Sequence, residues 1–74
     1  MPTTYFMHPE RMRTPEAGAY TTYSIVAYGP LGISVQAVRD VSSDGDLVFH
    51  MVREFNERRL PPPCLLEAIH DALE

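Results

Sequence analysis

The clearest pattern in the chain is an alternation of hydrophobic and polar positions in two neighbouring stretches. Residues 20–28 consist almost entirely of β-branched, aromatic and small residues, which suit a pleated sheet. Residues 33–41 alternate in the same way, and the segment Gly29-Pro30-Leu31-Gly32 between the two stretches supplies turn residues. The pattern therefore predicts an antiparallel hairpin of strands 20–28 and 33–41.

After residue 43 the hydrophobic residues follow a helical period. Ser43 or Asp44 can cap the first turn by accepting hydrogen bonds from its free N–H groups. Two apolar stripes follow, one formed by Leu47, Val48, Met51, Val52 and Phe55, the other by Leu65, Leu66, Ile69 and Leu73. The three prolines at 61–63 separate the stripes, because proline cannot continue a helix. We expect helices over 44–57 and 63–73.

The amino-terminal segment is less regular. Residues 3–8 favour a strand, but Pro2 and Pro9 on either side limit it to an optional, short edge strand. Residues 9–18 hold two prolines, a glycine and four charges, which is typical of an exposed, flexible loop. Together the elements predict a single α+β domain over 1–74, in which a small antiparallel sheet packs on two carboxyl-terminal helices.

Such a two-layer domain leaves one face of its sheet without a helix. Successive side chains of a strand point to opposite faces of the sheet. If Tyr23 faces the helices, Tyr20, Val26 and Tyr28 therefore lie on the other face, and Val38 of the next strand can join them. Tyrosine is enriched in protein interfaces, so these four residues are the predicted partner-binding surface. The alternative is that residues 1–18 fold over this face.

Length and charge narrow the classes of function. A chain of 74 residues needs nearly all its large apolar side chains for a core, which leaves little to line a deep substrate pocket. The net charge is −4, and residues 44–74 account for it with seven acidic residues against three arginines. This balance argues against a nucleic-acid or membrane-surface protein. With one cysteine, no long apolar run and no signal-peptide pattern, we expect a cytoplasmic protein.

Several side-chain pairs look like fragments of catalytic or metal sites, but each has a structural explanation. His50 and Glu54 are four apart on a helix and are expected on its solvated side. Cys64 and His70 are separated by about 240° around one helix, so they cannot touch. The segment Asp44-Gly45-Asp46 lacks the remaining oxygens of a calcium loop and is explained by helix capping. The sequence therefore predicts no catalytic residue, metal or cofactor.

Asn56 is the most informative polar residue of the helical half. It can end the first helix in a left-handed conformation or satisfy loop carbonyl groups. A contact with a partner is the alternative role.

One further pattern consists of Tyr23-Ser24-Ile25, the segment 38–44 before the first helix, Phe55-Asn56, and the final series Leu60, Pro62, Leu65, Ile69, Asp71 and Leu73. With this pattern, the chain over about residues 20–74 resembles a family of small uncharacterised bacterial proteins, a domain of unknown function. Ser24 and Cys64 depart from the glycine and histidine of that pattern. The resemblance implies a stand-alone intracellular protein and brings no known activity.

These observations favour a non-catalytic protein-interaction or regulatory module. Its partner would be another protein, or a second copy in a weak homodimer, at the open sheet face. The alternative is a binder of a small ligand or of single-stranded nucleic acid, which would use tyrosines together with Arg11, Arg13 and Arg39. An enzyme is the least favoured class.

Overall fold

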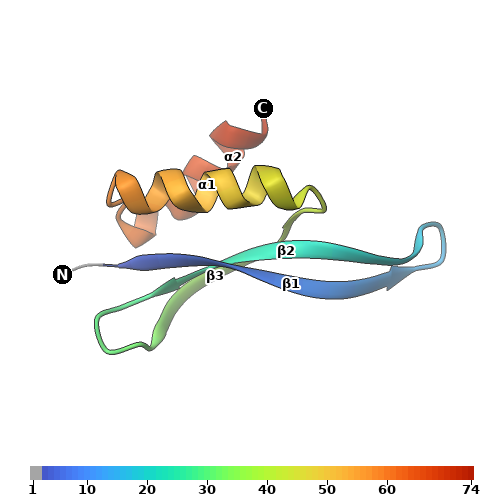
Figure 1. Ribbon diagram of the computed structural model, residues 1–74, viewed down its shortest axis with the longest axis horizontal. Helices are drawn as coiled ribbons and strands as arrows, with labels where there is room; N and C mark the ends of the chain where they lie inside the picture. Colours follow the sequence, from blue (N-terminus) through green and yellow to red (C-terminus); the bar gives the residue numbers. More distant parts are fainter. Residues whose placement is uncertain (1–2) are drawn as a thin grey trace.

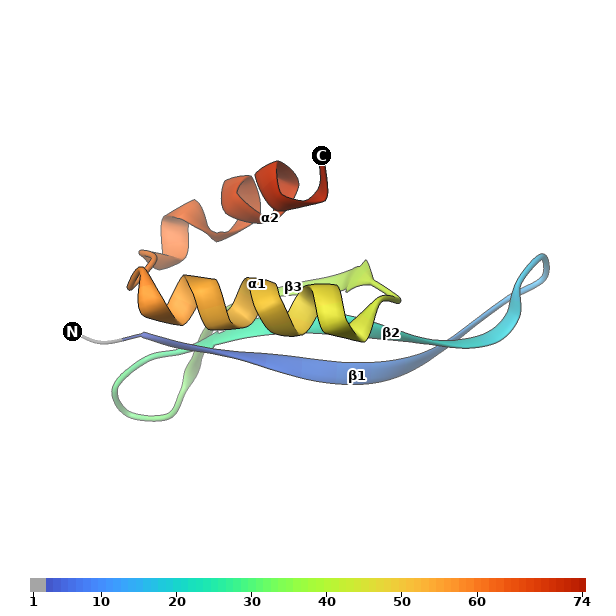
Figure 2. The same ribbon diagram turned by 45° about the horizontal axis from the view of Figure 1, so that its top comes forward.

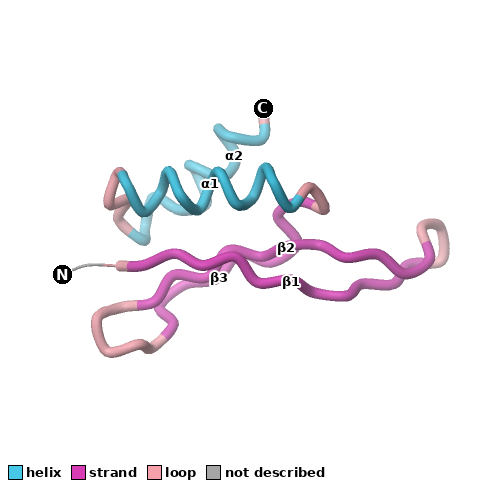
Figure 3. The backbone as a smooth tube through the Cα atoms, in the orientation of Figure 1, coloured by secondary structure: helices cyan, strands magenta, loops and turns pink. Residues whose placement is uncertain are grey.

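The protein is a three-stranded antiparallel meander with two helices on one face of the sheet (Figures 1 and 3). A computed structural model describes residues 3–74. In chain order, the elements are β1 (Thr4–Thr14), β2 (Gly18–Tyr28), β3 (Ser34–Ser42), α1 (Gly45–Glu57), the 3-10 turn η1 (Pro62–Cys64) and α2 (Leu65–Leu73). The strand order is β1-β2-β3. The structure confirms the predicted α+β fold, its hairpin and its two helices, with shifts of one or two residues at most boundaries.

The helices begin and end where their local chemistry requires. Asp44 caps α1, because its side chain accepts a hydrogen bond of 3.2 Å from the N–H of Leu47. Asp46 adds negative charge to the same first turn, where the helix dipole favours it. Past the other end, Arg59 adopts the left-handed conformation with φ of 53°. Asn56, for which this conformation was one of two expected structural roles beside the satisfaction of loop carbonyl groups, lies inside α1.

The core lies between β1, β2 and the two helices. Its largest fully buried side chains include Tyr5, Ile25, Leu65 and Val48. The Tyr5 ring meets the edge of Phe55 at a centroid distance of 6.0 Å, which joins the first strand to the end of α1. Met51, Val52 and Ile69 complete this cluster, so both predicted apolar stripes contribute to it.

The amino-terminal prediction was wrong in extent. Instead of a short strand over 3–8 and a flexible loop over 9–18, β1 runs through Pro9 to Thr14 and pairs with β2 along its whole length. A tight turn joins the two strands, with Ala17 N–H bonded to Thr14 Oγ1 at 3.0 Å and Gly18 at a φ of 70°. The turn residues that suggested a loop therefore make a hairpin.

Pro9 is tolerated because of the side on which its nitrogen lies. Alternate residues of an antiparallel strand direct their backbone groups to opposite sides. Tyr5 directs its N–H and C=O away from β2, toward Asn56 of α1. Pro9 has the same parity as Tyr5, so the N–H that it lacks would lie on the outer edge of the sheet and costs no bond with β2.

Asn56 ties the edge strand to α1. Its Nδ2 donates to the carbonyl of Tyr5 at 3.0 Å, and its Oδ1 accepts from the N–H of Tyr5 at 2.8 Å. The carboxamide thus pairs with β1 as the backbone of a further strand would. The Tyr5 hydroxyl donates to the carbonyl of Leu60 at 2.5 Å, and burial, followed by the nearby Cys64, raises the pKa of this phenol. We call these three residues, Tyr5, Asn56 and Leu60, the clamp.

Removing the clamp carboxamide should destabilise the fold. We expect Asn56→Ala to lower the free energy of unfolding by about 2 kcal/mol, because it leaves two backbone groups of Tyr5 without partners. Tyr5→Phe, which removes only the hydroxyl bond, should cost about 1 kcal/mol. Urea denaturation measures both. An Asn56→Ala protein within about 0.5 kcal/mol of the wild type would show that the carboxamide contributes nothing.

Candidate interaction surface on the open sheet face

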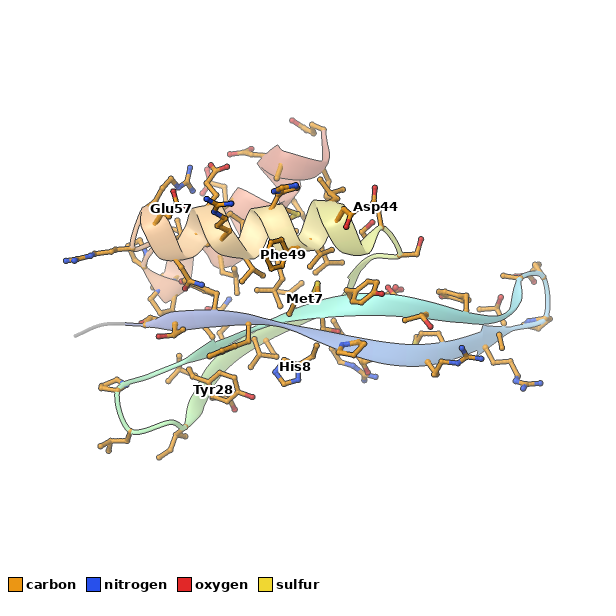
Figure 4. The ribbon with its side chains drawn as sticks, in the orientation of Figure 1. Met7, His8, Tyr28, Asp44, Phe49 and Glu57 are labelled. Atoms are coloured by element: carbon orange, nitrogen blue, oxygen red, sulfur yellow. The ribbon has the colours of Figure 1, made fainter. Side chains whose placement is uncertain are left out.

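One face of the sheet carries no helix. Figure 4 shows His8 and Tyr28 on this side and Met7 on the side of the helices. The register places Phe6 beside Val26, and Val26 beside Ala37 of β3, so these side chains share the open face.

An aromatic cluster occupies the end of the open face near the β2–β3 turn. The rings of Phe6 and Tyr28 meet edge to face at a centroid distance of 5.6 Å, and the rings of His8 and Tyr28 lie 6.1 Å apart. The Tyr28 hydroxyl lies 3.4 Å from Nε2 of His8. Phe6 nevertheless remains 49% exposed. We call Phe6, His8, Val26 and Tyr28 the open-face patch.

A hollow of about 540 Å³ adjoins the open-face patch. Thr4, Phe6, His8 and Tyr28 line it together with the turn 29–32. Beyond it, Leu31 and Ile33 are 85% and 64% exposed. Apolar surface therefore continues from the patch onto the turn, and the hollow is large enough to receive an apolar side chain of a partner.

A polar network crosses the middle of the open face. Ser24 of the central strand donates to Glu10 of β1 at 2.5 Å, and Arg39 of β3 forms an ion pair of 2.6 Å with the same carboxylate. Two residues before Ser24, on the same face of the strand, Thr22 donates a hydrogen bond to Asp40 at 2.6 Å. Thr22 and Ser24 are almost fully buried under these charged side chains. The network covers the central strand with hydrogen-bonded groups where no helix does.

The network changes the protonation of its acidic member. The hydrogen bond from Arg39, followed by the one from Ser24, lowers the pKa of Glu10 from 4.5 to about 2. The same pairing raises the pKa of Arg39. Glu10 and Arg39 therefore compensate each other's charge in the middle of the open face, with the Asp40 carboxylate beside them, whereas residues 44–74, which form the helical layer, carry a net charge of −4.

The structure separates the four predicted partner-binding residues. Val26 and Tyr28 lie together in the open-face patch, and both are half-buried. Tyr20 pairs with Met12 in the part of the hairpin that projects beyond the helices, on the far side of the polar network (Figure 1). The placement of Val38 was wrong: it lies opposite Ile25 and packs against the core on the helix side. A register shift between Ala27 and Tyr28 reverses the alternation of β3 between Ser34 and Gln36, so a regular alternation counted from the turn assigns Val38 to the wrong face.

Of the amino-terminal segment, residues 1–2 lie outside the described residues, and residues 3–18 do not cover the open face. From Thr4 to Thr14 they form the edge strand β1, which lies beside β2 in the plane of the sheet. Phe6 and His8 of this strand add to the open-face patch instead of hiding it. Sequence reasoning missed both residues because it assigned no register to the predicted strand 3–8 that contains them.

The side chains with potential chemistry stay dispersed. His50, Cys64 and His70 are exposed. A groove of about 450 Å³ between α1 and α2 is lined by Cys64, Glu54 and Asp71 but by no histidine. The hollow beside the open-face patch is lined by His8 but by no cysteine, aspartate or glutamate. Within residues 3–74, no set of three or more His, Cys, Asp or Glu side chains is placed to hold a metal ion. Neither cavity brings a cysteine together with a histidine.

The lowered pKa of Glu10 predicts a defined dependence of stability on pH. A folded-state pKa near 2, below the ordinary 4.5, stabilises the fold above pH 4.5, and this contribution is lost as the pH falls toward 2. Glu10→Gln should remove that part of the pH dependence, and Arg39→Ala should move the Glu10 midpoint toward 4.5. Carbon-detected NMR titration of the Glu10 carboxyl measures the shift. A wild-type midpoint near 4.5 would contradict the network.

Comparison with known proteins does not assign a function to the chain, so the proposal below rests on the geometry of the structure. The part of the chain that the structure describes contains no helix long and apolar enough to cross a membrane. No protein-family model matches the chain, and neither a curated protein nor a solved structure is significantly similar to it.

Proposed function

We propose that the protein is a non-catalytic, cytoplasmic interaction module that binds another protein through the open-face patch. The observation that carries the proposal is Phe6, a phenylalanine half exposed beside Tyr28 on a sheet face that has no helix over it. Aromatic side chains that border a hollow are typical anchors of protein interfaces. The membership of a small uncharacterised bacterial family stays a prediction and adds no activity.

The charge distribution supports this surface over the helical one. A partner that binds the open face contacts Glu10 and Arg39, whose opposite charges pair with each other. A partner that binds the helices instead contacts residues 44–74, which carry a net negative charge. The apolar turn residues Leu31 and Ile33 enlarge the contact area next to the patch. We infer a partner that presents an apolar side chain to the hollow, and a second copy of the chain at the same face is the alternative occupant.

A single-stranded nucleic acid is less well supported as the ligand. Arg39, the arginine nearest the patch, is engaged by Glu10. Arg11 and Arg13 have the parity of Tyr5 on β1, so they lie on the opposite face from Tyr28 and cannot clamp a strand against it. A mobility assay at low salt tests this alternative, and tight, salt-dependent binding of single-stranded RNA or DNA would favour it.

Matched phenylalanines provide the decisive test of the patch. Phe6 and Phe49 are 49% and 55% exposed, one in the patch and the other on α1. We expect Phe6→Ser and Tyr28→Ser each to weaken binding of a purified partner by at least about tenfold, and Phe49→Ser to leave it unchanged. The partner would first be captured from the source cells and then reconstituted with the purified protein for calorimetry.

Circular dichroism serves as the control that each variant is folded. A reconstituted partner that binds the wild type, Phe6→Ser and Tyr28→Ser equally would rule out the open-face patch as its site. If Phe49→Ser alone abolished binding, the contact would belong to the helical layer.

A further inference from the structure

The two outer edges of the sheet are protected differently. On the β1 edge, Asn56 occupies both outward backbone groups of Tyr5, and Pro9 has no N–H to offer. Edge strands commonly carry such devices, because an unpaired row of backbone groups invites a further strand. The β1 edge is therefore closed along its first half.

The β3 edge has a register shift on each side of residues 36–38, and within the described residues no further strand pairs with the stretch between the shifts. Because Tyr5 directs its backbone groups away from β2, its partner Ala27 directs its own toward β3. Ala27 lies opposite Gln36, and Ile25 opposite Val38, so these two β3 residues bond to β2. Ala37 between them directs its N–H and C=O outward, and it is exposed, as are Val35 and Arg39.

An apolar stripe on α2 lies on the same flank as this edge. Leu66 and Leu73 are 49% and 44% exposed. At about 100° per residue, they lie roughly 130° around α2 from Glu67 and Asp71, which line the groove with α1. Figures 1 and 2 place α2 behind α1, on the β3 side of the sheet. The stripe is thus turned away from the groove, on a helix that lies on the flank of the free strand edge.

We propose that a second copy of this chain pairs with β3 in an antiparallel register centred on Ala37. The two-fold axis is then perpendicular to the sheet, which joins two three-stranded sheets into one and keeps both helical layers on the same side. The leucine stripes of the two α2 helices approach each other across the axis. Strand pairing below and apolar contact above make one continuous interface.

The charges fit a second copy at this edge. A register centred on Ala37 sets Arg39 opposite Val35 of the second copy, so no like charges meet across the strands. Glu67 and Asp71 lie on the groove side of α2, away from the axis. In the dimer each copy uses its β3 edge and keeps only the β1 edge free, where Asn56 and Pro9 close the first half, which opposes further pairing into a fibre.

This interface is separate from the surface in the proposed function. With the axis perpendicular to the sheet, the open-face patches of both copies stay exposed on the side away from the helices. The dimer would therefore present two patches on one continuous sheet. A failure of one proposal leaves the other standing.

Sedimentation equilibrium of the purified chain, together with amide exchange, tests the pairing. We expect the wild type to dimerise, and Ala37→Pro, which removes the outward N–H as Pro9 does on β1, to weaken dimerisation by at least about tenfold. Leu66→Glu should have a similar effect. Ala37→Ser, which keeps the N–H, and Tyr28→Ser should leave the dimer intact.

Exchange of the Ala37 amide in the wild type gives a readout that needs no variant. Its N–H should become protected as the protein concentration rises from micromolar to millimolar, because only a second copy can bond to it. A chain that stays monomeric at millimolar concentration, with Ala37 exchanging at a constant rate, overturns the proposal. A dimer that survives Ala37→Pro but is lost in Tyr28→Ser overturns it equally, because the copies would then meet through the open face.

Discussion

The arrangement of the molecule depends on the clamp between the first strand and the end of α1. Asn56 bonds to both backbone groups of Tyr5, the Tyr5 hydroxyl bonds to Leu60, and the Tyr5 ring is buried against Phe55. The joined residues are 51 or 55 positions apart in the sequence. Few other links hold β1 to the helical layer so specifically, and the clamp also decides which backbone groups of β1 and β2 face outward.

The asymmetry of the sheet follows from this attachment. The two short helices cover one face, and the core draws its buried side chains from that side. On the other face the Glu10–Ser24–Arg39 network shields the central strand with polar groups, which leaves Phe6 and Tyr28 as the apolar part. At the β1 edge, the clamp occupies the outward backbone groups of Tyr5, whereas β3 forms the opposite edge of the sheet.

The sequence predicted those features of the fold that depend on the local order of residues. The hairpin, both helices and the Asp44 cap follow from periodicity and capping chemistry, and the structure confirms them. The extent of β1 did not follow, because the effect of Pro9 depends on which side of the strand its nitrogen faces. Val38 was placed on the wrong face because the register shift between Ala27 and Tyr28 reverses the alternation of β3 after Ser34. The role of Asn56 and the Glu10–Arg39 pair depend on the register of distant strands, which no local signal reveals.

The central claim is that the open-face patch is covered by a protein partner in the cell. Hydroxyl-radical footprinting of the protein in lysate of its source cells, compared with the purified protein, tests this most directly. The account predicts reduced labelling of Phe6 and Tyr28 in the lysate and unchanged labelling of Phe49, which is similarly exposed on α1. Equal labelling of Phe6 and Tyr28 in both samples, or protection of Phe49 instead, would contradict it.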